Sequence, residues 1–293
     1  MAEKLILFFE KLFHTLFGMV KILKGTTFRS RKKNPIAKDE TCYILGNGPS
    51  LNKVLNGNKI SFETENLFVV NGFGASELYT QIKPSFYILA DPAYFVENIN
   101  QSVQRKVDNL FVDLNEKTGW PVHFFVPFEA LKLIREKLKN NRNITVYGFN
   151  KVNTWKGFKW FDRWVYNNQW AIVSGFNVVM SAIHLAIGVG FKKIYLLGVD
   201  HSWHQNVIVG DDNLLYEYDT HFYDEKPKLT PVLIEEKGIS RFEKYHEQLG
   251  FLKKTFEAYH YIQDYAKYKD VIILNCTSDS YIDAFERYKL QID

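Results

Sequence analysis

A turn rich in glycine and small polar residues follows the first apolar run of the chain. Residues 41–45 read TCYIL, residues 46–50 read GNGPS, and a helix-like pattern begins after them. Glycine lets a backbone approach a phosphate or a sugar closely, and the N–H groups at a helix start favour anions. The sequence therefore predicts that this turn helps to hold a ligand of the nucleotide type.

Three more predicted strands end in residues that suit the same ligand. Asn71 follows one apolar run, Asp91 follows the next, and Gly198 and Asp200 end the run KKIYLLGVD. The carboxyl ends of parallel strands meet at one edge of a sheet, where ligands of α/β proteins bind. Each feature alone is ordinary loop chemistry. Together with a Ser-Gly pair at residues 174–175, where a long apolar helix starts, they predict one nucleotide-binding rim.

Short apolar runs alternate with helical patterns along the body of the chain. The predicted strands lie at residues 42–46, 67–71, 85–90, 109–114, 123–127, 192–200 and 271–275. The predicted helices lie at residues 128–140, 174–190, 242–268 and 280–290, and His184 in the second is interpreted as a core residue. This alternation is typical of an α/β, Rossmann-like fold, a mostly parallel sheet with helices on both faces. We expect one catalytic domain over residues 35–293, with a lid at about residues 201–240.

The familiar phosphate and metal motifs are missing from the sequence. GNGPS lacks the Gly-Lys-Ser/Thr of a Walker loop and the third glycine of a dinucleotide fingerprint. The second strand ends in Asn71 rather than in the acidic residue of a NAD site, and Glu217-Tyr218-Asp219 only imitates a D-x-D motif. We therefore expect a nucleotide site that uses no metal ion.

Several of these segments together resemble a known group of enzymes. GNGPSL, VVN, ILADPAYF and SGFNVVMSAIHLAIGVGFKKIYLLGVD are similar to the bacterial sialyltransferases of glycosyltransferase family 42. They are also similar to wider relatives, the motility-accessory-factor glycosyltransferases and the archaeal 6-hydroxymethylpterin diphosphokinase-like proteins. The resemblance covers about residues 41–290 in element order and is most specific in GNGPS and in the block that starts at Ser174.

The resemblance implies a Rossmann-like domain that binds the CMP part of a CMP-sugar without a metal or another cofactor, beneath a lid with a catalytic histidine. The positions that it assigns to the donor are Gly46, Asn47, Gly48, Pro49, Ser50, Asn71, Asp91, Ser174, Gly175, Gly198 and Asp200. Ser202 and Trp203 extend this expected donor site, and a tryptophan ring would stack on a sugar.

The departures from the sialyltransferase pattern leave the donor open. Those enzymes have asparagine where this chain has Asp91, arginine where it has Ala171, and a phosphate-binding tyrosine where it has Ser202. Tyr216 or Tyr218 is expected to stabilise the departing phosphate instead. Sialic acid, Kdo or a related acidic sugar on CMP, or a different nucleotide, are the alternatives.

Three histidine-bearing clusters lie in the second half of the chain. Transfer to a hydroxyl group requires a base that accepts its proton, and histidine suits that role near neutral pH. By its position relative to the family pattern, His246 is the first choice, while His221 and His201 in the lid region are alternatives. The H-x-x-H spacing at 201–204 has no acidic third ligand and gives little support for a metal.

The first 34 residues form a segment of different character. Apolar residues recur at helical spacing over residues 4–25, and Glu10 and Lys11 in the middle argue against a spanning helix. The basic residues Arg29, Arg31, Lys32 and Lys33 come next. We expect an amphipathic helix on an anionic membrane surface, with packing on the body or on a second subunit as the alternative.

Charge and cysteine content narrow the function classes further. Residues 1–40 hold nine Lys/Arg against four Asp/Glu, so the remaining body is close to neutral and shows no nucleic-acid footprint. The two cysteines fit a reduced compartment. The sequence predicts an inverting, metal-independent, CMP-sugar-dependent glycosyltransferase for a lipid-linked or surface-polysaccharide acceptor. It would lie peripherally at the cytoplasmic face of a bacterial membrane, and the sequence leaves open whether it forms a homo-oligomer. The alternatives are a Mg-dependent pterin or nucleotide diphosphokinase and a non-catalytic nucleotide-sugar-binding partner of a polysaccharide assembly complex.

Overall fold

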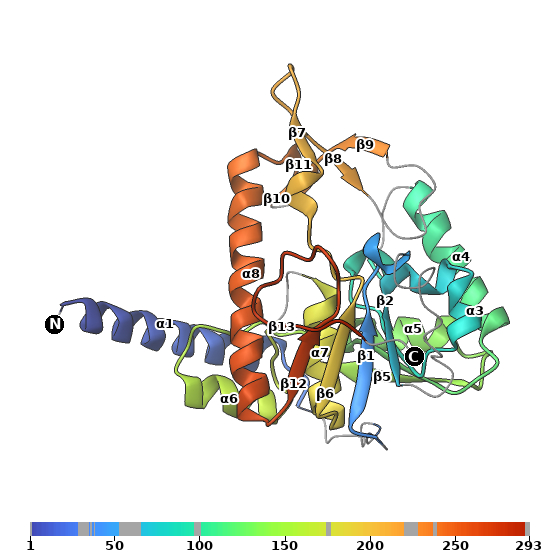
Figure 1. The fold of residues 1–293 in the computed structure, drawn as a ribbon, viewed down its shortest axis with the longest axis horizontal. Coiled ribbons are helices and arrows are strands. Elements are labelled where there is room, and N and C mark those ends of the chain that lie inside the picture. The colour runs from blue at the N-terminus through green and yellow to red at the C-terminus, as the bar shows by residue number, and fades with distance from the viewer. Residues whose placement is uncertain are drawn as a thin grey trace.

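A parallel sheet of eight strands forms the centre of the protein (Figure 1). The computed structural model describes residues 2–28, 35, 37, 39–52, 66–96, 101–173, 177–219, 228–236 and 239–290. The strands of the sheet are β1 (Thr41–Leu45), β2 (Leu67–Val70), β3 (Phe86–Ile88), β4 (Val122–Pro127), β5 (Ile144–Phe149), β6 (Lys193–Leu197), β12 (Ile272–Asn275) and β13 (Glu286–Arg287).

The order of the strands places a switch point beside β1. The sheet runs β13-β12-β6-β1-β2-β3-β4-β5, and every neighbouring pair is parallel. The chain therefore builds outward from β1 through β5, then returns to the other side of β1 as β6. Leu45 at the end of β1 lies between Val69 of β2 and Leu197 of β6. Ligands of doubly wound sheets bind beyond the strand ends at such a reversal.

Helices cover both faces of this sheet, as the sequence predicts. They are α3 (Leu78–Ile82), α4 (Gln101–Lys117), α5 (Leu131–Lys137), α6 (Lys159–Asn167), α7 (Val178–Val189) and α8 (Tyr245–Tyr268), with the N-terminal α1 (Ala2–Gly25) beside them. Alternate residues of a strand point to opposite faces. Cys42 and Ile44 accordingly pack in a cluster with residues of α7 and α8, while Leu45 packs with residues of α3, α4 and α5. The α/β, Rossmann-like expectation is confirmed.

Helix α7 is buried almost throughout, because it packs directly on the sheet. His184 in its middle accepts a hydrogen bond from the backbone N–H of Val173, with 3.0 Å between N and Nε2. Burial lowers the pKa of this histidine to about 3, so its ring is neutral. The interpretation of His184 as a core residue is thereby confirmed.

Small antiparallel sheets lie within residues 207–242, in the region where the sequence predicts a lid. We use the name lid region, or lid, only for the place of these strands in the fold. Strands β7 (Val207–Val209), β8 (Leu215–Asp219) and β9 (Lys228–Pro231) form one sheet, and β10 (Leu233–Glu236) and β11 (Ile239–Phe242) form a hairpin. Figure 1 shows them beside the first turns of α8. The sequence pattern treated this region as irregular, because each strand is short and only half-buried.

Two predicted elements are wrong. Residues 109–114 belong to α4, not to a strand, because Val107, Leu110 and Leu114 recur at helical spacing and bury one helix face. Residues 280–290 are not a helix. There β13 pairs with β12, and Arg287 donates to the carbonyl oxygen of Thr277 at 3.1 Å, which holds the chain extended. The pattern also missed β5 and α6.

Helix α1 confirms the predicted helical segment, but it packs in an unexpected way. Thr15, Gly18 and Ile22 are its buried residues, and they face the segment around α6. Gly18 lies so close to Phe161 that an added Cβ would be 3.0 Å from the ring. None of the helices in the described residues combines the length and hydropathy that crossing a membrane requires.

Candidate functional site

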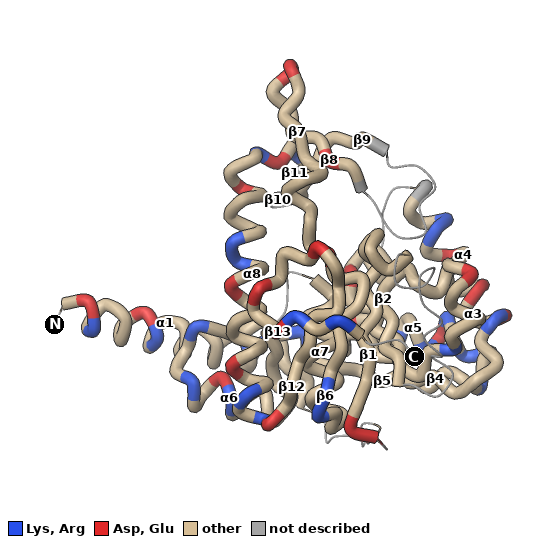
Figure 2. Tube along the Cα trace, in the orientation of Figure 1, with Lys and Arg blue, Asp and Glu red and all other residues tan. Residues whose placement is uncertain are grey.

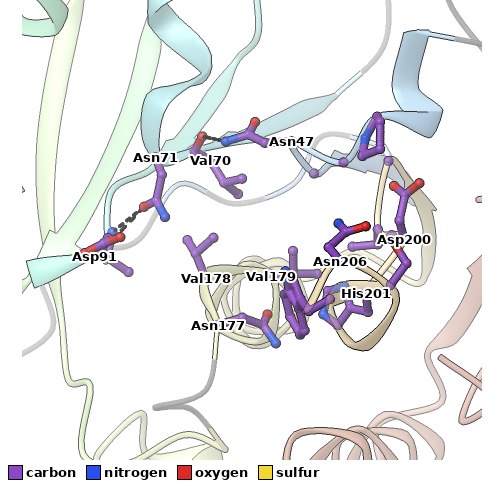
Figure 3. A pocket seen from close by; sticks show the side chains of 18 of the residues that line it. Asn47, Val70, Asn71, Asp91, Asn177, Val178, Val179, Asp200, His201 and Asn206 are labelled. Carbon is purple, nitrogen blue, oxygen red and sulfur yellow. Dashed lines mark hydrogen bonds between the residues drawn. The ribbon is translucent and has the colours of Figure 1, made fainter. Parts of the chain in front are cut away.

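A cavity of about 440 Å³ opens at the switch point of the sheet (Figure 3). Its lining comes from the segments after β1, β2, β3, β5 and β6, from the start of α7, and from the lid. It is therefore the place where the rim residues of the sequence pattern converge. The turn at 46–49, Asn71, Asp91 and the segment 198–203 all contribute to it.

The glycines of the turn allow the ends of β1 and β6 to meet. The N–H of Gly46 donates to Leu197 O at 2.8 Å, and the N–H of Gly48 donates to Gly198 O at 2.9 Å. A Cβ on Gly46 would lie 2.4 Å from Gly198 O, and Gly198 has a φ of +64°. Only glycine fits such contacts without displacement of the backbone. The turn is thus shaped first by the strand beside it.

Asp200, which lines the cavity, holds the turn in place through Ser50. The Asp200 carboxylate accepts from the backbone N–H of Ser50 at 3.1 Å and from its hydroxyl at 2.8 Å. Ser50 is buried and does not line the cavity. The helical segment that starts at Ser50 therefore already receives a negative charge at its N-terminus. A ligand phosphate would need its positive partner elsewhere in the cavity.

Asn47 of the turn and Asn71 at the end of β2 are two of the asparagine side chains around the cavity in Figure 3. Asn71 has a φ of +45°, and its Oδ1 accepts from the backbone N–H groups of Ala90 and Asp91 at 3.2 and 3.4 Å. It joins the ends of β2 and β3. Asn47 donates to Val70 O at 3.3 Å, while its buried Oδ1 has no hydrogen-bond partner in the described part of the chain. An unpaired buried amide oxygen is costly, so a ligand donor would find an acceptor there.

Lys151 brings a positive charge into the cavity, and the sequence analysis missed it. It follows β5, and its Nζ donates to Ala90 O at 2.6 Å. Burial lowers the pKa of this lysine, and the nearby carboxylates of Asp91 and Glu129 oppose that effect. Among the described residues that line the cavity, Lys151 is the only lysine or arginine.

The position of Lys151 also bears on the arginine that the sialyltransferase pattern would place at Ala171. Ala171 is fully buried. The segment that follows Lys151 runs beside it, because the N–H of Ile172 donates to Val152 O at 2.9 Å. Lys151 thus supplies a positive charge to the cavity from the segment that pairs with the one containing Ala171. No motif marks it, since the two segments are distant in the sequence.

A chain of three side chains connects the lid side of the cavity to α8 and α7. His201 Nε2 lies 2.7 Å from the Tyr259 hydroxyl, which donates to Asn177 Oδ1 at 3.0 Å. Because the tyrosine proton goes to Asn177, the tyrosine oxygen accepts from His201, and Nε2 carries the imidazole proton. Burial lowers the pKa of His201 to about 3, so the ring stays neutral. Asn177 also accepts from Met180 N–H and so caps α7.

The other predicted site residues fall into three groups. Pro49, Ser202, Trp203 and Tyr218 line the cavity, and Trp203 packs on His201 with 4.3 Å between ring centroids. Tyr216 points elsewhere and donates to Asp212 at 2.7 Å, and His246 is exposed on the first turn of α8, outside the cavity lining. Ser174, Gly175 and His221 lie outside the described residues, as do Arg29, Arg31, Lys32 and Lys33.

The cavity also includes residues that the sequence analysis did not assign to it. Asn177, Asn206 and Glu217 line it together with Lys151. A helix-capping signal was available for Asn177, because an asparagine directly precedes the long apolar helix. Asn206 and Glu217 belong to the lid, whose position over the sheet no local pattern gives.

The fold is that of a Rossmann-like protein with a cavity at the switch point of its sheet, and comparison with known proteins adds the family. Residues 14–206 match the family described as 6-hydroxymethylpterin diphosphokinase MptE-like. Since that segment covers about two thirds of the chain, the protein belongs to this family. The resemblance to the wider group is confirmed. The matched segment contains the cavity's sheet-borne walls and ends before the lid strands.

The comparison with solved structures concerns the fold alone. The chain is similar to the MAf glycosyltransferase from Magnetospirillum magneticum AMB-1, with 14% sequence identity and a TM-score of 0.49. The match covers 96% of this chain and 39% of that one, so this chain spans well under half of its neighbour's length. No curated protein matches the chain.

Proposed function

We propose that this protein is a glycosyltransferase that uses a CMP-linked acidic sugar and needs no metal ion. The observation that carries the proposal is the cavity at the switch point, where one lysine lies among asparagine side chains and glycine backbone. Amides and backbone groups suit a base and a ribose, and one cation suits the small charge of a nucleoside monophosphate. The acceptor would be a lipid-linked or surface polysaccharide.

The chemistry would be a direct displacement at the anomeric carbon. The acceptor oxygen forms its bond to that carbon while the bond to the phosphate oxygen breaks, and the electron pair leaves with CMP. Lys151 would stabilise the charge on the departing phosphate, with Tyr218 as the tyrosine that lines the same cavity. The acceptor proton must pass to a base.

We propose that a histidine is that base. His246 and His201 are the two candidates that lie in the part of the chain that the structure describes. His201 lines the cavity, but its low pKa makes it a weak base; its neutral ring can accept a hydrogen bond through Nδ1. His246 would serve an acceptor that binds against the lid and the first turn of α8. His221 is the third alternative and lies outside the described residues.

A second function is favoured by the name of the family to which the chain belongs. A Mg-dependent pterin or nucleotide diphosphokinase would transfer a diphosphate from ATP. Asp91 and Glu217 both line the cavity, and carboxylates are the ligands that Mg²⁺ uses beside phosphates. In the part of the chain that the structure describes, however, no group of three or more His, Cys, Asp or Glu side chains could hold a metal ion.

A thermal-shift comparison distinguishes these functions. The protein is heated with CMP, UDP, GDP or ATP, each with EDTA and with Mg²⁺. Stabilisation by CMP in EDTA supports the proposal, whereas stabilisation by Mg-ATP alone rejects it. CMP binding without turnover of any CMP-sugar would instead indicate the non-catalytic binding partner.

A further inference from the structure

Helix α1 binds the body of the protein through a narrow strip of small contacts. Thr15 Oγ1 accepts from Phe158 N–H at 2.9 Å, Gly18 packs on Phe161, and Ile22 is buried. These residues lie within one third of the helix circumference, at 100° per residue. Figures 1 and 2 show the N-terminal half of α1 projecting away from the body.

The opposite face of α1 is apolar and points outward. Its row of large exposed side chains is Leu5, Phe9, Phe13, Leu16, Val20 and Leu23, which we call the outward face. Phe13 is 65% exposed and Leu23 is 74% exposed. A soluble helix normally buries such a face against its own protein. Here the protein buries the face that carries the threonine and the glycine, so the outward face needs another cover.

The breadth of the outward face favours a membrane over a second copy of the helix. A two-stranded coiled coil needs only a narrow apolar seam and places charged residues beside it. On α1, Ile6 and Phe17 lie beside the outward face and are exposed apolar residues as well, so the apolar surface is wider than a coiled-coil seam. A bilayer surface covers about half of a helix that lies in it.

Aromatic side chains and charge support the same cover. Trp160 and Trp164 are exposed on α6, the helix whose Phe161 contacts α1, and tryptophan is enriched at membrane interfaces. The first 40 residues carry nine Lys/Arg against four Asp/Glu, while the rest of the chain is close to neutral. Such a basic excess beside an apolar helix is attracted to anionic lipid headgroups.

We propose that α1 lies in the plane of an anionic membrane surface, with the outward face at the boundary of headgroups and acyl chains. The helix ends at Gly25, which lines a second cavity of about 340 Å³ together with Thr27. Lys151 lines both this cavity and the larger one. A membrane-bound α1 would therefore bring the lipid surface beside the ligand site.

Vesicle sedimentation of the full chain tests this inference. Vesicles of phosphatidylcholine with phosphatidylglycerol should bind the protein more strongly than vesicles of phosphatidylcholine alone. The combined change Leu5→Gln, Phe13→Gln, Leu16→Gln and Leu23→Gln should weaken binding about tenfold or more, because each removes apolar area from the interface. The change Val112→Gln, Leu133→Gln and Ile272→Gln alters exposed apolar residues elsewhere and should leave binding unchanged.

The oligomeric state without lipid supplies the opposing outcome. The membrane inference is wrong if the protein does not bind anionic vesicles. It is also wrong if the native protein forms a dimer without lipid and the fourfold glutamine variant of α1 abolishes that dimer. Circular dichroism of both variants verifies that they fold. This test measures no nucleotide binding, so its result is independent of the proposed function.

Discussion

Removal of the positive charge of Lys151 should weaken phosphate binding while leaving nucleoside binding intact. Lys151→Met removes the one lysine or arginine among the described residues that line the cavity, and it leaves the asparagine and glycine residues of the lining unchanged. A hydrogen bond to a charged group contributes about 1.5–3 kcal/mol, so the Kd for CMP should rise about 10- to 100-fold. Cytidine has no phosphate, and its Kd should change little.

Calorimetric titration with CMP and with cytidine measures both constants. Lys151→Arg, which keeps the charge, should retain most of the affinity for CMP, and Lys132→Met on α5 is the matched control for loss of a lysine outside the cavity lining. Since burial lowers the pKa of Lys151, the CMP affinity of the native protein should fall as the solution is made alkaline, earlier than an ordinary lysine would cause. Equal losses for CMP and cytidine, or no loss for either, would refute the assignment of Lys151 to the phosphate.

Three further changes test other parts of the structure. Gly48→Ala places a Cβ 1.9 Å from Asp200 Oδ2 and 2.7 Å from Gly198 O, so urea unfolding should show a loss of stability of about 2 kcal/mol or more. The control Gly119→Ala adds a Cβ with no atom within 4 Å and should leave stability unchanged. Equal effects of the two changes would contradict the turn geometry. Burial raises the pKa of Asp162 to about 7, so its contribution to stability is present at acid pH and is lost as the pH rises through about 7. Between about pH 5 and pH 8 the free energy of unfolding of the native protein should fall by about 2–3 kcal/mol, whereas that of Asp162→Asn should not show this fall. Parallel plots of unfolding free energy against pH for the two proteins would show that Asp162 is ionised in the fold. With a CMP-sugar and a suitable acceptor, His246→Ala should lower kcat and leave the donor KM unchanged, whereas His201→Gln should raise the donor KM; the reverse pattern would make His201 the base.

The rim of the cavity was predictable because several of its residues are local signals. A glycine turn after an apolar run and an asparagine or aspartate after another each mark a strand end. The parallel arrangement then brings these ends together, and Gly46, Asn71, Asp91 and Asp200 do lie around one cavity or beside it. Their contacts were less predictable, since the Asp200 carboxylate accepts hydrogen bonds from Ser50, which no local pattern indicates.

The misassigned elements show where local pattern fails. The run at 109–114 is apolar at a strand-like density, and only its burial along α4 shows the helical period. The segment 280–290 places its apolar residues at helical spacing, yet the Arg287 side chain donates to the Thr277 carbonyl oxygen, and pairing with β12 holds the segment extended. Tertiary contacts thus override weak local preference in short segments.

The sequence by itself determined the α/β alternation, the glycine turn, the core role of His184 and the helical character of the N-terminus, because each depends on neighbours close in the chain. The tertiary structure alone decided that Lys151 reaches the cavity, that His201 is bound to Tyr259, and that α1 turns its apolar face outward. These depend on packing between segments far apart in sequence. No local period or motif encodes which face of a helix its own protein will cover.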